Sequence, residues 1–340
     1  MPPLLYRFLI TVIIPIFNTG PYLTKTIDSV ISQTIGFQEN IQIILVNDGS
    51  TDNTESICLQ YQEKYPSNII YIKQDNMGAS AARNRGLEYA EGKYINFLDS
   101  DDRWRPTAFK RLYTFFEQHY DEVDVVGARM FLFDGEAGYH ILDYKFRKTK
   151  VVDLRTEWSF IQLHASSSFI KTAAIQTKRF DPAIKYGEDG HFINTIILSK
   201  CKYGIVRNAV HWYRKRTAND SMMQTKTNDL NYYFDSLKHF YLDLFNRSYQ
   251  LYGEYLKFIQ YIFMYDFQWR IQQHYVESHC LSPDYFDLYY NNLTMQLRLV
   301  DSDVITSQRH MTRKQKLLCI WKNAHPSTQP DLLYEYFLEQ

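Results

Sequence analysis

Three carboxylates within four positions, Asp99, Asp101 and Asp102, follow a short apolar run that begins at Tyr94. The run has the length of a β-strand, so its end would place hard oxygen ligands at the carboxyl edge of a sheet, where open α/β sheets hold their ligands. One or two carboxylates, completed by phosphate oxygens, suit Mg²⁺ or Mn²⁺. For an isolated Asp-x-Asp a solvated acidic turn is the favoured interpretation, so the neighbouring segments must decide whether a site is present.

Polar residues also follow three earlier apolar runs. The expected strands and the polar residues behind them are Ile10–Ile16 with Asn18, Ile41–Val46 with Asp48, and Ile69–Lys73 with Asp75 and Asn76. A polar group at the same end of four strands favours a binding site over polar residues that are merely exposed to solvent.

Helical patterns separate these strands. Leu23, Ile27 and Val30 recur at helical spacing, Ser50 or Thr51 is placed to cap a helix that runs to about Tyr65, and a third helix is expected over 79–90. Alternating strands and helices with short connections predict an α/β fold with a mostly parallel sheet.

The remaining chain is less regular. The expected elements are a helix over 105–119, a strand over 123–133, a loop over 134–151, a short helix over 158–164, a strand entered at 165–170, a helix over 192–198 and a strand over 203–213. From about residue 224, apolar stripes such as Leu230, Tyr233 and Leu237 recur at helical spacing. We therefore expect two domains, an α/β domain over 1–223 and a helical domain over 224–340.

Composition narrows the class of protein. Lysine plus arginine and aspartate plus glutamate both number 38, so no basic field points to nucleic acid. The four cysteines are far apart, without metal-ligand spacing, as expected for reduced thiols in the cytoplasm. The apolar amino terminus is interrupted by Arg7 and Pro15, which predicts a buried strand rather than a signal peptide or a membrane span. We expect a cytoplasmic protein, with peripheral membrane association as the alternative.

Five segments together resemble the family-2 glycosyltransferases with the GT-A fold. They are Val12–Asn18, Val46–Thr54, Asn76–Asn84, Phe97–Asp102 and Gly187–Asp189, in the order and spacing of that family. The resemblance covers about residues 8–223 and implies a Rossmann-like sheet flanked by helices. The helical region resembles no family that we can name.

The resemblance implies a reaction. Such an enzyme moves a hexose or N-acetylhexosamine from a UDP-sugar to a hydroxyl of a glycan or lipid-linked acceptor, with inversion, commonly in cell-surface polysaccharide synthesis. Single displacement needs one general base, because a sugar hydroxyl is a poor nucleophile until its proton is accepted. Asp189 matches the family base, and Glu188 is the neighbour that would orient it or the acceptor.

The resemblance also implies a donor and metal site. Donor contacts are expected at Pro15, Asn18, Asp48 (to uracil N3–H), Asn76, Arg83, Asp99, Arg214, Arg216 and Ser221, and Mn²⁺ or Mg²⁺ at Asp101, Asp99 and His211. Asp102 would support these aspartates, Arg129 would reach the donor sugar, and Ser166–Ser168 would line the acceptor pocket.

Plainer explanations stand beside these roles. Asp48, Glu188 and Asp189 also suit helix amino termini, His211 also suits an aromatic core, and arginines are usually solvated. The competing functions are a nucleotidyltransferase, which the missing Gly-rich loop near the first strand disfavours, and a non-catalytic glycan-binding or scaffold protein. The helical region would contact the acceptor, a membrane through basic residues at 309–316, or a second copy in a homo-oligomer; alternatively its stripes form only a bundle core.

Overall fold

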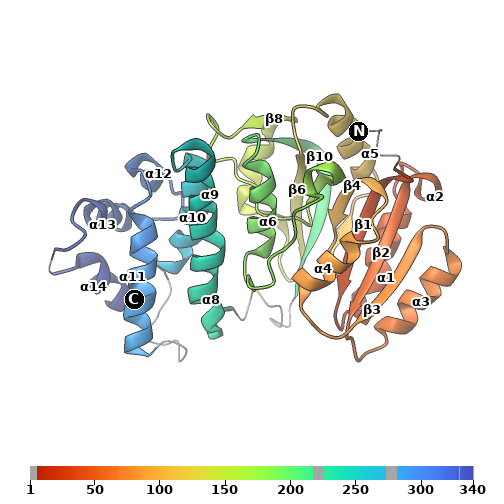
Figure 1. Ribbon diagram of the computed structural model, residues 1–340, viewed down its shortest axis with the longest axis horizontal. Coiled ribbons are helices and arrows are strands. Elements are labelled where there is room, and N and C mark those ends of the chain that lie inside the picture. Colours follow the sequence, from red (N-terminus) through yellow and green to blue (C-terminus); the bar gives the residue numbers. More distant parts are fainter. Residues whose placement is uncertain (1–5, 217–225, 273–281, 329, 340) are drawn as a thin grey trace. The chain divides into compact units, whose positions relative to one another are not determined.

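The computed structural model describes residues 6–216, 226–272, 282–328 and 330–339 (Figure 1). These residues form two compact units. Of the described residues, the sheet unit contains 6–153, 162–182 and 188–216, and the helical unit contains 154–161, 183–187 and everything from 226 onward. The chain therefore enters the helical unit twice before it reaches the expected boundary near residue 223.

The first half of the sheet is parallel, as predicted. Its strands are β1 (Phe8–Ile16), β2 (Ile41–Asp48), β3 (Ile69–Gln74) and β4 (Gly92–Phe97), in the order β3-β2-β1-β4. Val12 in β1 lies opposite Ile43 on one side and Asn96 on the other. Every residue of β2 is buried, as expected for a strand covered on both faces.

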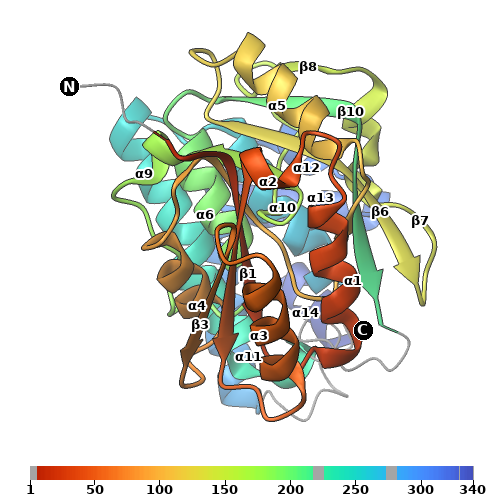
Figure 2. The same cartoon turned by 90° about the vertical axis from the view of Figure 1, so that its right-hand side faces the viewer.

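Helices cover both faces of these strands. Alternate side chains of β1 point to opposite sides, and because both sets are apolar, each face packs against helices. Val12 and Ile14 pack in one core with α1 (Gly20–Ile31), α3 (Thr54–Lys64) and α5 (Ala108–Gln118). Ile13 faces α4 (Ala79–Leu87), where a Cβ added at Gly86 would lie 2.4 Å from the Ile13 side chain. Figure 2 shows α1 and α3 on one side of the strands and α4 on the other.

The second half of the sheet is mixed. It continues from β4 through β9 (Ser168–Lys171), β6 (Val125–Asp134), β10 (Lys202–Lys215) and β5 (Arg103–Trp104). β9 is antiparallel to both β4 and β6, whereas β6 and β10 are parallel. α6 (Glu188–Ile197) packs where the two halves meet, with Phe192 edge-on to Phe97 of β4. β5 was not predicted, because a strand of two residues is too short to show an alternating hydrophobic pattern.

Three local predictions were wrong. Neither Ser50 nor Thr51 caps α3, which begins at Thr54, because Asp52 Oδ1 accepts the Thr54 N–H at 3.1 Å instead. No helix forms over 158–164. The expected loop over 134–151 contains structure, namely β7 (Gly138–Tyr139), the 3₁₀ segment Ile141–Arg147 and the start of β8 (Lys150–Asp153).

The helical unit contains the predicted stripes. Its longer elements are α8 (Leu230–Asp235), the π-helical segment η4 (Ser236–Leu242), α9 (Asp243–Tyr252), α10 (Lys257–Arg270), α11 (Pro283–Leu297), α13 (Arg313–Ala324) and α14 (Leu332–Glu339). Tyr233, Leu237 and Leu244 are buried, whereas Leu230 is exposed. Among the helices that the structure describes, none has the length and apolar character to cross a bilayer.

Candidate active site

Asp48 lies at the carboxyl end of β2 and holds the loop after β3. Its Oδ1 accepts from Gln74 Nε2 at 2.7 Å and from the Met77 N–H at 2.9 Å, and its Oδ2 accepts from the Gly78 N–H at 2.8 Å. The side chain is buried. Asp48 therefore has a structural task in this loop, and its predicted contact with uracil stays a prediction.

The loops after β1 and β2 are also joined. Asn18, in the left-handed region at φ 51°, accepts the Thr51 N–H on its Oδ1 at 2.8 Å, and its own N–H donates to Ser50 Oγ at 3.0 Å. Pro15 lies in β1 opposite Val46. The backbones of the loops after β2 and β3 approach closely, because a Cβ on Gly49 would lie 2.9 Å from the nitrogen of the exposed Asn76. The predicted base-binding residues are thus neighbours.

A buried arginine joins the two expected halves of the site. Arg83 of α4 contacts Asp99 Oδ1 from Nη2 at 3.0 Å, Glu188 Oε1 from Nη1 at 2.9 Å and Asp189 Oδ1 from Nη1 at 3.2 Å. Its side chain is 5% exposed. One guanidinium therefore holds the aspartate behind β4 and the two acids that open α6, which are about ninety positions apart in the sequence.

Three acids around one cation leave excess negative charge in a buried site. Burial alone would lower the pKa of Arg83, but Asp189, Asp99 and Glu188 together raise it. Burial raises the pKa of Glu188 to about 7, against the opposing effect of Arg83. Burial also raises the pKa of Asp99. The cluster is therefore prepared to receive positive charge or a proton.

Asp189 is fixed from a second direction. Its Oδ2 accepts the backbone N–H of Ala165 at 3.0 Å, just before the run Ser166–Ser168. Those serines are buried; Ser166 and Ser168 supply carbonyl oxygens to Asn96 Nδ2, each at 2.9 Å. The residue predicted to be the base is thus held by a backbone N–H as well as by Arg83.

The end of β10 and the residue that follows it bring two arginines, Arg214 and Arg216, to the acidic loop after β4. Arg216 Nε donates to Asp101 Oδ2 at 2.8 Å. Arg214 donates from Nε to the Asp101 carbonyl at 3.1 Å, and its Nη1 contacts Asp134 at 2.5 Å. The Arg214 guanidinium also lies 4.5 Å from the Tyr22 ring centroid. Ser221, the third residue predicted here, lies outside the described residues.

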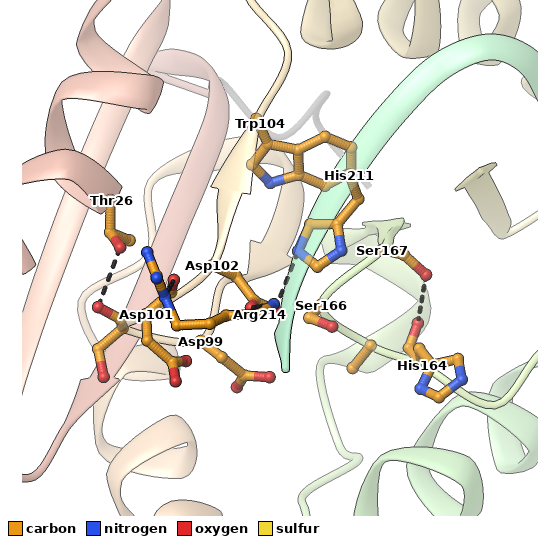
Figure 3. Close-up of polar contacts among 12 residues, drawn as sticks. Thr26, Asp99, Asp101, Asp102, Trp104, His164, Ser166, Ser167, His211 and Arg214 are labelled. Carbon is orange, nitrogen blue, oxygen red and sulfur yellow. Dashed lines mark hydrogen bonds and ion pairs between the residues drawn. The ribbon is translucent and has the colours of Figure 1, made fainter. Parts of the chain in front are cut away.

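His211 packs behind the acidic loop. Its Nε2 is 3.4 Å from Asp102 Oδ2, both side chains are essentially inaccessible, and Trp104 covers the ring edge-on at 4.9 Å (Figure 3). Burial lowers the pKa of His211 to about 3. Asp102 Oδ1 accepts the Arg214 N–H at 2.7 Å, so Asp102 connects the loop to β10. Asp102 thus has structural partners in β10, and its support of the other two aspartates stays a prediction.

The predicted metal ligands fit an ion only in part. No group of three or more His, Cys, Asp or Glu side chains is arranged around a metal position in the described part of the chain, so Asp99, Asp101 and His211 do not form a ligand set. Arg83 donates a hydrogen bond to one oxygen of Asp99, and Arg216 donates one to one oxygen of Asp101. Burial also raises the pKa of Asp101, with the neighbouring Asp99 adding to the effect. This chemistry fits a hard cation that takes its other ligands from substrate phosphates and water.

The sequence did not indicate a second polar cluster. Lys145 Nζ donates to Gln162 Oε1 at 2.8 Å, and the rings of His140 and His164 meet at 5.0 Å. These four residues and Ser167 line a cavity of about 10 Å³, room for about one water molecule. Two separate segments, 140–145 and 162–167, supply them, so no spacing marks the cluster in the sequence.

Arg129, predicted to reach a donor sugar, is engaged elsewhere. It forms a two-pronged pair with Asp143, at 2.8 Å from Nε and 2.6 Å from Nη2. Its guanidinium also lies 3.7 Å from the ring centroid of Tyr139. The geometry therefore gives Arg129 a structural partner, and a sugar contact would require this pair to open.

The fold and this site define a class. An α/β sheet that gathers carboxylates at its strand ends, with an acidic pair opening a later helix, is the arrangement that the sequence resemblance implied. Residues 11–175 match the family model described as glycosyl transferase family 2. Residues 11–175 therefore form a family-2 glycosyltransferase domain, and the fold is GT-A.

Two relatives come from Bacillus subtilis (strain 168). The chain is 39% identical over 307 residues to the minor teichoic acid biosynthesis protein GgaB, an alignment that covers 90% of this chain and 34% of GgaB. It is 33% identical over 297 residues to the minor teichoic acid biosynthesis protein GgaA, covering 86% of this chain and 64% of GgaA. The chain thus spans about a third and just under two thirds of these two relatives.

A solved structure has the same fold. Residues 1–349 of S. aureus TarS in complex with UDP-GlcNAc superpose with a TM-score of 0.68 at 19% identity, covering 97% of this chain and 89% of that chain. At this identity the likeness concerns the fold alone.

Proposed function

We propose that this protein transfers a sugar from a UDP-sugar to a hydroxyl of a glycan or lipid-linked saccharide, with inversion at the anomeric carbon, in the synthesis of a cell-surface polysaccharide. Membership of glycosyltransferase family 2 supports the reaction class. The teichoic acid biosynthesis proteins GgaB and GgaA support the pathway class, and the UDP-GlcNAc complex of TarS supports the donor class.

One observation carries the proposal. The Arg83 guanidinium contacts Asp99 on one side and Asp189 on the other, so a donor-side carboxylate and the general base lie about one side chain apart. A displacement reaction requires its base and its leaving group to be held on either side of the reacting carbon. A scaffold protein would have no need of this buried excess of negative charge.

In the reaction, Asp189 accepts the proton of the acceptor hydroxyl. The acceptor oxygen then uses an electron pair to form the new bond to the anomeric carbon. At the same time the bond between that carbon and the UDP β-phosphate oxygen breaks, and its electron pair leaves with UDP. The backbone N–H of Ala165 and the guanidinium of Arg83 hold Asp189 for this step. Glu188 shares Arg83 with the base and orients it.

The leaving diphosphate gains negative charge, which cationic groups in the site stabilise. Arg216, which is paired with Asp101, would contact the diphosphate, and Arg214 contacts the same loop through the Asp101 carbonyl. Asp101 and Asp99 would hold Mn²⁺ or Mg²⁺, which when bound supplies Lewis-acid stabilisation of the phosphate oxygens. Asn18, Asp48 and Asn76 would bind the nucleotide base and ribose.

We further propose that the protein works in the cytoplasm, where its acceptor is either soluble or presented at the inner face of the membrane. Exposed apolar side chains of the helical unit, including Leu251, Leu288 and Leu317, would serve contacts with the acceptor, a membrane surface or a second copy.

The test is an Asp189→Asn variant supplied with Mn²⁺ and a panel of UDP-sugars. Release of UDP in the presence of acceptor should fall by about 10²–10⁴-fold, because the base no longer accepts a proton, while UDP affinity stays that of the wild type. Asp284→Asn, an exposed residue of α11, is the matched control and should keep full activity. Full activity in Asp189→Asn would remove Asp189 as the base. A wild type that releases UDP from no UDP-sugar would remove the transferase assignment.

A further inference from the structure

Two short segments of the chain that belong to the helical unit lead directly to the general base. Residues 183–187 are followed by Glu188 and Asp189, which return the chain to the sheet unit. Residues 154–161 are followed within four positions by Ala165, whose N–H donates to Asp189 Oδ2 at 3.0 Å. The base and its hydrogen-bond donor are therefore each within four residues of an anchor in the helical unit.

A carboxylate at the start of α8 holds the segment 183–187. Asp229 Oδ2 accepts from Lys185 Nζ at 2.6 Å and from the Tyr186 hydroxyl at 3.0 Å. The other oxygen, Oδ1, accepts the Asn231 N–H at 3.0 Å and caps α8. The same side chain thus orders the helix start and the segment that precedes the base.

An aromatic ring fixes the last residue of this segment. Gly187 has φ +89°, and a Cβ added there would lie 2.7 Å from Phe240 Cδ1. Phe240 belongs to η4, is 3% exposed and stacks on Tyr241 at 4.2 Å between ring centroids. Only glycine adopts this backbone conformation readily, and only glycine leaves room for the ring. Gly187 therefore combines a left-handed backbone with the close approach of the Phe240 ring inside the helical unit.

Aromatic contacts hold the segment 154–161 within the same unit. The Arg155 guanidinium lies 4.9 Å from the Tyr252 ring centroid, and Trp158 meets Tyr261 edge-on at 5.6 Å. Ile161, the last residue of the segment, is fully buried. Tyr252 ends α9 and Tyr261 lies in α10, so two helices share this anchor.

We infer that the helical unit is a positioning element for the general base: it anchors the two segments that carry Asp189 and its Ala165 hydrogen-bond donor. The inference rests on the proposed function, in which Asp189 is the base. Gly187, Phe240 and Trp158 are then positioning residues, which act through the backbone at Glu188 and Ala165. Misplacing a reacting group by about 1 Å costs about 10²-fold in rate.

The experiment compares Gly187→Ala with Gly253→Ala in the full chain loaded with Mn²⁺. Gly253 also lies in the helical unit with a left-handed φ of +71°, but an added Cβ would meet nothing within 4 Å, so this control carries the backbone strain without the clash. Gly187→Ala should lower kcat by about 10- to 100-fold and leave KM for the UDP-sugar and UDP affinity unchanged. Gly253→Ala should keep the wild-type kcat.

Trp158→Ala tests the other anchor and keeps the inference open to refutation if Gly187→Ala does not fold. It should lower kcat in the same way, and amide hydrogen exchange over residues 162–165 should accelerate, as it should over 188–190 in Gly187→Ala. Phe245→Ala, which removes a buried ring elsewhere in the helical unit, should change neither readout. The exchange measurement does not need turnover, so it tests positioning even if the wild type transfers no sugar.

The inference is overturned if Gly187→Ala and Trp158→Ala keep the wild-type kcat and exchange rates. It is also overturned if they lose activity only through weaker UDP binding, or if Gly253→Ala and Phe245→Ala lose as much. A wild type without transferase activity but with these exchange changes would instead count against the proposed function alone.

Discussion

Arg83 Nη2 lies 3.0 Å from Asp99 Oδ1, and this pair ties helix α4 to the acidic loop behind β4. The same guanidinium continues to Glu188 at 2.9 Å. Because Arg83 is the shared partner, its removal would separate the donor side of the site from the base side and leave buried carboxylates without a counter-ion.

Arg83→Ala should therefore destabilise the protein strongly. Removing one partner of a buried pair costs about 3–5 kcal/mol, since the remaining charges stay buried without compensation. Urea denaturation at pH 8 measures this loss in the free energy of unfolding. Arg85→Ala, on the same helix with a surface pair to Glu88, should cost at most about 1 kcal/mol. Equal losses in the two variants would show that the Arg83 cluster contributes no more than a surface pair.

The pH dependence of stability should reveal Glu188. Burial raises the pKa of Glu188 to about 7 from its ordinary value of 4.5, so between these values the folded protein binds a proton that the unfolded chain has lost. The contribution of Glu188 to the free energy of unfolding is therefore full below pH 4.5 and is lost as the pH rises through 7.

Glu188→Gln removes this dependence. As the pH rises from 5 to 8, the free energy of unfolding of the variant should increase relative to that of the wild type by an amount on the order of 3 kcal/mol. Urea denaturation at several pH values measures this difference. For Glu63→Gln, on the exposed side of α3, the free energy of unfolding should change with pH as it does in the wild type. If Glu188→Gln also runs parallel, the acid is not held in its protonated form.

Much of the sheet unit could be predicted because its signals are local. The β-branched run at 10–16 and the apolar run at 41–46 are continuous, as strands buried on both faces must be, and Asn18 and Asp48 mark where they end. The resemblance added Asp189, which spacing alone would have left as an acid at a helix start. The structure brings it to within 3.2 Å of Arg83.

The misses arise where distant segments decide the outcome. Nothing near Arg83 indicates that its partner Glu188 comes 105 positions later. The helix expected over 158–164 does not form, because Trp158 packs on Tyr261 and residues 154–161 join the helical unit. His211 had the right residue type for a metal ligand, but only the fold shows that Trp104 covers it.

Asp101 should control the metal dependence of nucleotide binding. If Asp101 holds the ion, UDP raises the melting temperature of the wild type more with Mn²⁺ than with EDTA, because the ion bridges protein and diphosphate. In Asp101→Asn the two shifts should become equal, with a loss of about tenfold or more in UDP affinity, or about 1.4 kcal/mol. A metal-dependent shift that survives in Asp101→Asn would move the ion away from this carboxylate.

His211 should prove structural rather than metal-binding. Its ring is fully buried against Trp104 at 4.9 Å, and both ring nitrogens lack a hydrogen-bond partner among the described residues. His211→Phe keeps a flat ring in this aromatic site and should cost about 1–3 kcal/mol of stability, since shape changes in a packed core are felt.

The decisive measurement on His211→Phe is again the UDP-induced shift in melting temperature with Mn²⁺ and with EDTA. The difference between the two should match wild type, in contrast to Asp101→Asn, because the buried imidazole faces Asp102 at 3.4 Å and is not arranged with Asp99 and Asp101 as a ligand set. A loss of the Mn²⁺-dependent part in His211→Phe, at unchanged EDTA binding, would mean that the loop rearranges when nucleotide binds and that His211 turns toward the ion. The two variants together therefore separate a carboxylate-and-phosphate site from one completed by an imidazole.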